Sequence, residues 1–468
     1  MTKELTSEQL ANFAKAYDAN PANTIAQHAA SHNGVMSAAY SSEVENQIPD
    51  IFSIDVKETG EITNQKQSGR CWMFAGLNVL RSIAMKKLHV KNLELSQSFL
   101  MFYDKLEKSN YELEAALDNL DEPDNSRLMD TILTIGGHQD GGYWHFFTEL
   151  VKKYGVCPKG VQGETVPTSS SSEMDSVLEQ ILSRDVMKLR ALHRDGKTAA
   201  ELRALKDDML SEVYRVLTIC IGKPVDKFTW EYLEDDPEKK DEKKDDKKAE
   251  KADDKKPEEN QYRRLTMTPK EFFDKYVGTD LDDYVVLTNW PLRGLKMNQT
   301  YTTKLCNNVV GAPAAKSLNL PIADLKNAII ASLKGKDLVW FACDVSAYLL
   351  RKGGILDTKL VDLDNLFSTT LNFDKGDRLI SHASMCNHAM TFTGVNIGPD
   401  GNPDRWKVQN TWGKDAGING YFVMTDRWFD GFVYEAIINK KYLTPAQLKA
   451  FAKKPVVLEP WAPVNQAL

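Results

Sequence analysis

The sequence predicts an α+β protein with two lobes, one helical and one built on an antiparallel, barrel-like sheet, plus a helical insertion and a C-terminal arm. After position 71, apolar residues recur at helical spacing, as Met73, Leu77, Leu80 and Ala84. Beyond position 281, short alternating segments separated by turn residues are typical of antiparallel strands. A chain of 468 residues exceeds a typical single domain, so it has room for both lobes and an insertion.

The first third of the chain predicts an extension followed by the helical lobe. Residues 1–60 are expected to form an N-terminal extension with one short helix, because Thr6 and Gln9 have the spacing of a capping box. Residues 61–160 are expected to form the helical lobe that carries Cys71.

Residues 161–280 are expected to form an inserted subdomain, which is rich in helix between positions 173 and 217. Segments 228–232 and 261–265 alternate like the two strands of a hairpin. Nearly every residue of 234–259 between them is charged, so this stretch has little to bury and is expected to be a solvated loop. A partner-binding role for the loop is the alternative.

Residues 281–440 are expected to form the β-rich lobe, and residues 441–468 the C-terminal arm. His388 precedes one expected strand, and Asn410 ends another. Three prolines favour an extended arm, and Trp461 is unusual for a purely solubilising tail. The expected strands of the lobe are 338–345, 390–397, 405–410, 420–424 and 432–439.

Charge and cysteine usage restrict the class of protein. The net charge of −7 argues against a nucleic-acid binder, which would usually be basic. The sequence has no run of eighteen apolar residues and no hydrophobic signal core at its start, so no membrane span is predicted. Six widely and irregularly spaced cysteines do not resemble a secreted disulfide framework. A cytoplasmic protein is therefore expected.

Cys71 is the candidate nucleophile. It follows a turn at Ser68–Gly69 and opens the helical run, where the helix dipole and free N–H groups would stabilise a thiolate. A cysteine at a helix start is by itself more often a small core residue. Together with an imidazole at His388 and an amide at Asn410, however, it completes the parts of a cysteine nucleophile site. The Gln65 amide, beside the Cys71 N–H, would form an oxyanion hole.

The motifs around these residues resemble the bleomycin hydrolase and aminopeptidase C branch of the papain-like cysteine peptidases. The resemblance covers roughly residues 40–468 and implies a papain-like fold. It implies that Cys71 is the nucleophile, His388 the general acid and base, Asn410 the imidazole orienter and Gln65 the oxyanion donor. The matching stretches are Gln65-x5-Cys71-Trp72, Glu94-Leu95-Ser96-Gln97, Asp140-Gly141-Gly142, Lys153 to Lys159, Trp340 to Val345, Asn387-His388-Ala389-Met390, Asn410-Thr411-Trp412-Gly413 and Gly420 to Met424.

The same resemblance implies an aminopeptidase that acts on peptides. Asp140, Gly141 and Gly142 would line the substrate cleft, and the arm would place the Leu468 carboxylate where it receives the free α-amino group of the substrate. The tail departs from the usual family pattern, for example with Asn465 in place of a glycine. Relatives form homohexameric rings, so a homohexamer is expected. Two alternatives remain open, namely a papain-like endopeptidase and a non-catalytic binding protein on a peptidase fold.

Metal and cofactor sites are not predicted. His382, Cys386 and His388 are close in sequence, but no second cluster of comparable ligand density accompanies them. The paired glycines do not form a phosphate-binding motif, so no nucleotide is implied.

Overall fold

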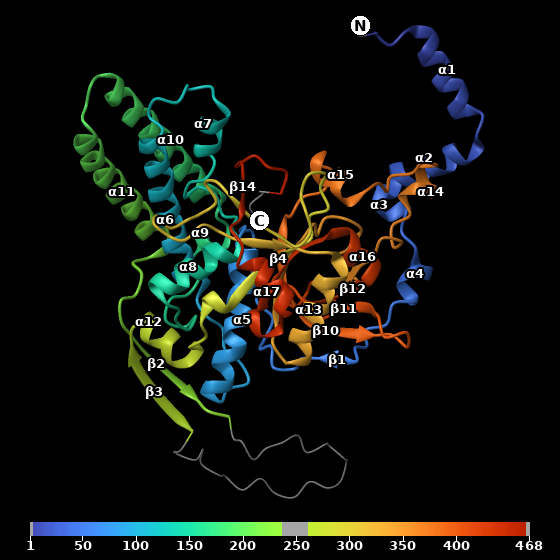
Figure 1. Ribbon diagram of the computed structural model, residues 1–468. Coiled ribbons are helices and arrows are strands. Elements are labelled where there is room, and N and C mark those ends of the chain that lie inside the picture. The colour runs from blue at the N-terminus through green and yellow to red at the C-terminus, as the bar shows by residue number, and fades with distance from the viewer. Residues whose placement is uncertain (1–2, 236–260, 465–468) are drawn as a thin grey trace, which may run out of the picture.

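A computed structural model describes residues 3–235 and 261–464 of the chain. Helices gather on one side of the molecule and a large mixed sheet on the other, with helix α5 (Cys71–Leu88) between them (Figure 1). Trp72, Phe74 and Leu80 on α5 are fully buried, and the helix is apolar around most of its circumference. Such a helix belongs in the interior of a large core. One continuous core accordingly joins α5 to both sides.

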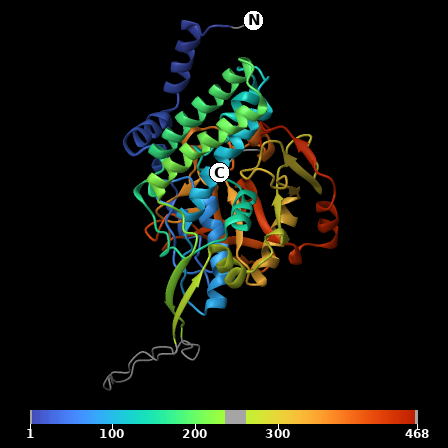
Figure 2. The same ribbon diagram turned by 90° about the vertical axis from the view of Figure 1, so that its left-hand side faces the viewer.

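The helices beside α5 include the expected insertion. Helices α10 and α11 are a long antiparallel pair that packs on α6, and Figure 2 shows this pair in front of the body. Thr198 caps α11 through a capping box with Glu201. The principal helices of this side are α6 (Gln97–Asp118), α7 (Arg127–Ile132), α8 (Trp144–Tyr154), α9 (Val166–Ser169), α10 (Ser172–Arg194), α11 (Ala199–Ile221) and α12 (Pro269–Phe272).

The predicted hairpin is confirmed. Strands β2 (Phe228–Leu233) and β3 (Tyr262–Met267) pair antiparallel, and the hairpin extends away from the body in Figure 2. Of the charged loop 234–259, only residues 234 and 235 lie within the described part of the chain.

The N-terminal extension contains four helices rather than one short helix. The capping box of Thr6 and Gln9 is present, and α1 projects from the body with none of its residues buried (Figure 1). Two of the additional helices begin at side-chain caps. The Asn20 side chain accepts a backbone N–H at the start of α2, and the Ser41 side chain does so at the start of α4. The four helices are α1 (Ser7–Asp18), α2 (Pro21–Asn33), α3 (Val35–Ala38) and α4 (Ser42–Asn46).

The sheet contains all five expected strands but is not purely antiparallel. Strand β9 runs parallel to β12, β6 to β4, and β14 to β5. Strands β6, β9 and β14 are only two or three residues long, which is too short for an alternating apolar pattern to reveal them in the sequence. The neighbour order is β14-β5-β6-β4-β13-β7-β10-β11-β12-β9-β8, with β1 also paired to β10. The strands are β1 (Ile54–Asp55), β4 (Tyr284–Thr288), β5 (Gln299–Thr303), β6 (Ser317–Asn319), β7 (Val339–Cys343), β8 (Leu349–Leu350), β9 (Ile355–Leu356), β10 (His388–Ile397), β11 (Pro403–Gln409), β12 (Tyr421–Thr425), β13 (Val433–Asn439) and β14 (Val456–Leu458).

Several helices accompany the sheet. Helix α13 packs against β13, β10 and β7, and α17 packs against β5 before the chain enters β14. On the α5 side, the Trp340 indole of β7 donates a hydrogen bond of 3.0 Å to the Trp72 carbonyl, which fixes the nucleophile helix to the sheet. The helices on this side are α13 (Ile322–Lys334), α14 (Leu363–Phe367), α15 (Lys375–Ile380), α16 (Asp426–Phe432) and α17 (Pro445–Phe451).

Candidate active site

Cys71 is the first residue of α5, as the sequence predicted. The turn before it is held by buried polar contacts. The Arg70 guanidinium donates to the Ser68 hydroxyl at 2.9 Å and forms an ion pair with Glu164. The Gly69 N–H donates to the Asp140 carboxylate at 2.8 Å. Because each end of the turn is tied to another element, the Cys71 thiol has little freedom to move.

The surroundings of Cys71 act on its pKa in opposite directions. Burial raises the pKa of the thiol, and backbone N–H groups of Ala389, Trp72 and Cys71 lower it. Burial is the larger effect, since the side chain belongs to a residue that is only 2% exposed, and the pKa is raised to about 11. The hydrogen bond from Ala389 also places the sulfur beside the residue that follows His388.

His388 is the first residue of β10, and Asn410 directly follows β11. The His388 Nε2 and Asn410 Oδ1 atoms are 2.9 Å apart, and the same Oδ1 accepts the Thr411 N–H at 2.7 Å. An amide oxygen only accepts, so Nε2 carries a hydrogen and Nδ1 of the neutral ring is left as the base. The Trp412 ring covers the imidazole with a centroid distance of 4.8 Å. The arrangement fixes both the tautomer and the ring plane.

Burial also determines the charge of His388, which is 4% exposed. Loss of hydration lowers the pKa of its imidazole to about 4; the Asn410 bond opposes this shift, and the nearby Arg351 charge adds to it. Burial therefore favours the neutral form of each group taken singly. The thiolate that the sequence predicted needs the attraction of an imidazolium to form.

Gln65 joins the nucleophile turn to the strand end that carries Asn410. Its backbone N–H donates to the Thr411 carbonyl at 2.8 Å, and its Oε1 accepts the Thr411 hydroxyl at 2.5 Å. Its Nε2 donates to the Ser68 carbonyl at 2.8 Å. An amide nitrogen has two hydrogens, so one is left for a substrate oxyanion.

Asp140 holds the turn before Cys71 in place through several contacts. Its carboxylate accepts from Gly69 and Ser171 and forms an ion pair with Lys105 at 2.9 Å, while its carbonyl accepts the Trp72 indole N–H at 2.8 Å. Lys105, which is fully buried, also pairs with Asp175. The sequence singled out Asp140 only as a lining residue and gave no sign of Lys105, because a charged residue on a helix ordinarily indicates a solvated face.

Gly141 and Gly142 lie along the same wall. The Gly141 carbonyl accepts a hydrogen bond of 2.6 Å from the Lys108 ammonium. Gly142 lies so close to the Trp72 ring that an added Cβ would be 2.5 Å from the ring atom Cε2. Glycine is therefore required here by close packing, and the backbone of the wall is free of side chains at this point.

The described part of the arm approaches the site from the sheet edge. Strand β14 pairs with β5, and Glu459 forms an ion pair with Lys304 at 2.6 Å. Val464 then packs against the buried cluster of Leu292, Leu379 and Tyr434. Cys386, two residues before His388, packs against the same cluster. Leu468 lies outside the described residues, so its predicted place is not part of this description.

The described ranges contain neither a metal-ligand cluster nor a membrane-spanning helix. No three histidine, cysteine or acidic side chains there are grouped as metal ligands. No helix in the same ranges has the length and apolar character to cross a membrane. All six cysteines are free thiols.

Comparison with known proteins places this geometry in a family. The family model described as "Peptidase C1-like family" matches residues 4–250 and 248–465. The chain belongs to the Peptidase C1-like family. It is 37% identical to Aminopeptidase C of Lactobacillus delbrueckii subsp. lactis over 468 residues, which is 99% of each chain. It is likewise 37% identical to Aminopeptidase C of Listeria monocytogenes over 465 residues, again 99% of each.

A solved structure of this family has the same fold. The crystal structure of PepW from Lactobacillus rhamnosis HN001 superposes with a TM-score of 0.92 at 38% identity, and the match covers 100% of both chains. The papain-like family fold expected from the sequence is thus confirmed for this member of the Peptidase C1-like family.

Proposed function

We infer that the chain is a cysteine aminopeptidase. The observation that carries the inference is the convergence of Cys71, His388 and Asn410 from α5, β10 and the end of β11 on one buried site. Full-length relatives are named Aminopeptidase C and, in one case, Aminopeptidase G. Catalysis requires no metal or organic cofactor, because the thiol and imidazole supply the nucleophile and the proton transfers.

The proposed reaction proceeds through an acyl-enzyme. The His388 Nδ1 takes the proton of the Cys71 thiol as the sulfur attacks the carbonyl carbon of the first peptide bond. The Gln65 amide and the Cys71 N–H stabilise the oxyanion. The imidazolium then protonates the leaving amine, and a water activated by His388 releases the first residue of the peptide. Asp140, Gly141 and Gly142 form one wall of the proposed substrate cleft.

The C-terminal arm is proposed to make the enzyme an exopeptidase. The described part of the arm pairs with β5 through β14, and Val464 packs against the same buried cluster as Cys386. A carboxylate on Leu468 would pair with the α-ammonium group of the substrate and would obstruct a longer chain.

The experiment that tests this function compares peptide amides with a free or an acetylated N-terminus. The intact protein is expected to cleave only the free-amine substrates, and a variant that lacks residues 466–468 is expected to gain cleavage of the acetylated ones. Cys71→Ala serves as the control for contaminating peptidases and should have no activity. Cleavage of acetylated peptides by the intact protein would instead indicate an endopeptidase, and activity in Cys71→Ala would contradict the nucleophile.

The wider organisation is also a proposal. We propose that the helical side and the sheet act as two lobes around the cleft, with an antiparallel barrel-like core at β13, β7, β10, β11 and β12. A homohexamer is proposed for the assembled enzyme, and six free thiols support a reducing, cytoplasmic location. The proposed units are residues 1–60, 61–160, 161–280 with the loop 234–259, 281–440 and 441–468.

A further inference from the structure

One pocket of the described structure holds a carboxyl group and a hydroxyl group close together. Glu435 and Thr302 line this pocket, and the two residues are only 8% and 9% exposed. The Thr302 hydroxyl is buried and has no hydrogen-bond partner in residues 3–235 and 261–464. Loss of hydration is the one effect that shifts the pKa of Glu435, with no charged or hydrogen-bonding neighbour among the described residues contributing. Buried polar groups are rarely left without partners, so each such group needs an explanation in terms of water, a ligand or function.

The register of the sheet places Glu435 on the side that faces α5. Ala389 of β10 is opposite Ala342 of β7, and Ala342 is opposite Glu435 of β13. Directly opposed residues share a face, so these three form a row across neighbouring strands. The Ala389 N–H donates to the Cys71 sulfur at one end of the row. Two strand spacings of about 4.8 Å each separate the Ala389 and Glu435 backbones along this row.

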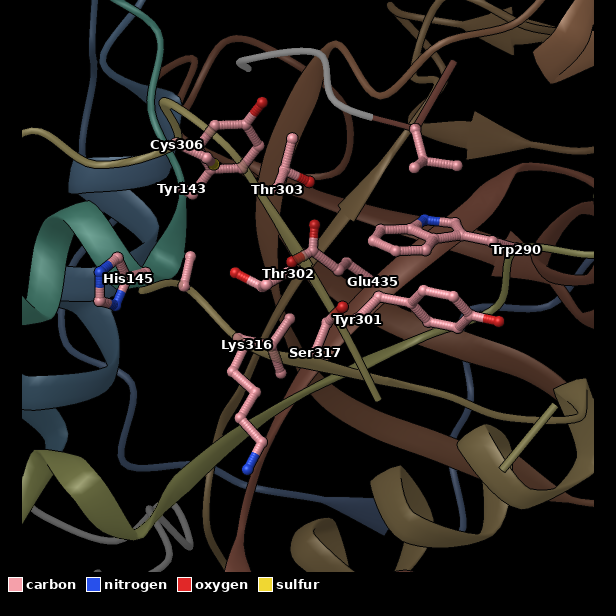
Figure 3. A pocket seen from close by; sticks show the side chains of 13 residues that line it. Tyr143, His145, Trp290, Tyr301, Thr302, Thr303, Cys306, Lys316, Ser317 and Glu435 are labelled. Carbon is pink, nitrogen blue, oxygen red and sulfur yellow. The ribbon is translucent and has the colours of Figure 1, made fainter. Parts of the chain in front are cut away.

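The walls of the pocket suit a cation. Figure 3 shows the Glu435 carboxyl group in the middle of the pocket, with the Trp290, Tyr301 and Tyr143 rings around it. The pocket has a volume of about 50 Å³, which admits a compact group such as an ammonium with one or two waters. A carboxylate accepts strong hydrogen bonds from an ammonium, and aromatic faces attract the same charge.

The nearest lysine does not neutralise this carboxyl group. Lys316 also lines the pocket, but its ammonium end points away from Glu435 in Figure 3 and lies over the Phe451 ring at 4.3 Å. Burial without a compensating cation raises the pKa of Glu435 to about 7. A bound ammonium would supply the missing countercharge and hold the carboxylate ionised.

We propose that Glu435 and Thr302 form a subsite for an ammonium group of the substrate, supplied by the free α-amino group or by the side chain of an N-terminal lysine. This inference rests on the proposed aminopeptidase function and names the groups of the protein that recognise the substrate cation. The subsite is built on strands β13 and β5, so it does not depend on the terminal residues of the arm.

The test is the kinetics of Glu435→Gln and Thr302→Val on two fluorogenic amides, namely leucyl and lysyl. Loss of a charge-assisted hydrogen bond predicts an increase in KM of about tenfold or more for Glu435→Gln, with a smaller increase for Thr302→Val. An increase for leucyl and lysyl amides alike assigns the α-amino group. An increase for lysyl amide alone assigns the side chain. Unchanged KM values for both free-amine substrates would overturn the subsite.

The pH dependence of KM is a second test, because a purely structural effect of the substitution would not change it. In the intact protein, KM for leucyl amide should rise as the pH falls below about 7, since Glu435 then binds a proton; Glu435→Gln should lack this change. Among the other ionisable groups that line the pocket, burial raises the pKa values of Tyr143 and Cys306 and lowers those of His145 and Lys316. Loss of the pH dependence in Glu435→Gln is therefore the comparison that assigns it to Glu435 rather than to His145.

A matched control is Glu112→Gln. Glu112 is a second buried glutamate, with a pKa raised to about 8, but it lies on α6 away from the pocket. Its replacement should leave KM unchanged. Alkylation of Cys71 is measured in every variant to separate the subsite from the proposed aminopeptidase function. If Cys71 still reacts and KM is unchanged, only the subsite is contradicted. Combining Glu435→Gln with removal of residues 466–468 then distinguishes the subsite from the arm, since only the arm should control cleavage of acetylated peptides.

Discussion

At the residue scale, Cys71 and His388 have opposite pKa shifts from one cause. Burial disfavours the charged form of each side chain, so it raises the pKa of the thiol to about 11 and lowers that of the imidazole to about 4. Neither group is therefore activated by its surroundings alone. The geometry compensates by leaving the His388 Nδ1 as a base while Asn410 holds Nε2 at 2.9 Å.

His388→Ala is expected to slow alkylation of Cys71 by iodoacetamide at pH 7 by about 100-fold or more, since a positioned base typically contributes that much. The remaining reaction should accelerate with rising pH, because the isolated thiol deprotonates only near its raised pKa of about 11. Peptide mass spectrometry of Cys71 measures the rate separately from the other five free thiols. The control is His193→Ala in the insertion helix α10. Equal rates in wild type and His388→Ala would exclude the imidazole as the base.

At the element scale, α6 supports the nucleophile turn through charge. The buried Lys105 ammonium bridges Asp140 and Asp175, and Asp140 in turn holds Gly69 and the Trp72 indole. The lysine charge lowers the pKa of Asp140 despite its burial. Sequence reasoning placed Asp140 near the site but could not identify this support, because only the packing of α6 against the turn makes the lysine buried.

Lys105→Met is expected to destabilise the protein by about 3–5 kcal/mol, because it removes a buried ammonium and leaves two partly buried carboxylates without their countercharge. We also expect reduced kcat, since the Gly69 turn loses its anchor. Urea denaturation and steady-state kinetics measure the two effects. The control is Lys197→Met, which breaks an exposed pair with Glu201 on the surface and should change neither. A Lys105→Met protein with wild-type stability would show that the bridge contributes nothing.

At the scale of the whole molecule, the N-terminal helices α1 and α2 carry apolar side chains that are exposed to solvent. Leu10, Phe13 and Ile25 are each more than half exposed, and α1 and α2 bury no residue within the described chain. Exposed large apolar side chains of this kind are typical of a surface that another protein covers. A second copy of the chain is the partner that the proposed homohexamer supplies.

Removal of residues 1–33 is therefore expected to reduce the assembly to smaller species, with light scattering as the measurement. Phe13→Ser should weaken the assembly in the same direction, and Lys15→Ser on the same helix is the matched control. The truncated protein should still react with iodoacetamide at Cys71, because these helices bury nothing of the site. An unchanged assembly after truncation would exclude the N-terminal helices from the interface.

The sequence by itself pointed to the candidate residues for the chemistry. Cys71 at a helix start, His388, Asn410 and Gln65 could be named from motifs and spacing, and the capping box at Thr6 and the β2–β3 hairpin followed from local preferences. Each motif, cap and strand pattern depends mainly on residues close together in the chain, so it can be recognised in the sequence.

Only the tertiary structure decided the state of those groups and their supports. The burial that shifts Cys71 and His388, the lysine beneath Asp140 and the unpartnered carboxyl of Glu435 arise where segments far apart in sequence pack together. Loss of hydration depends on every element around a group, and charge pairing across elements depends on where the chain folds back. The sequence thus pointed to Cys71 as the candidate nucleophile, and the packing set the direction of its pKa shift and built the pocket proposed to recognise the cation of its substrate.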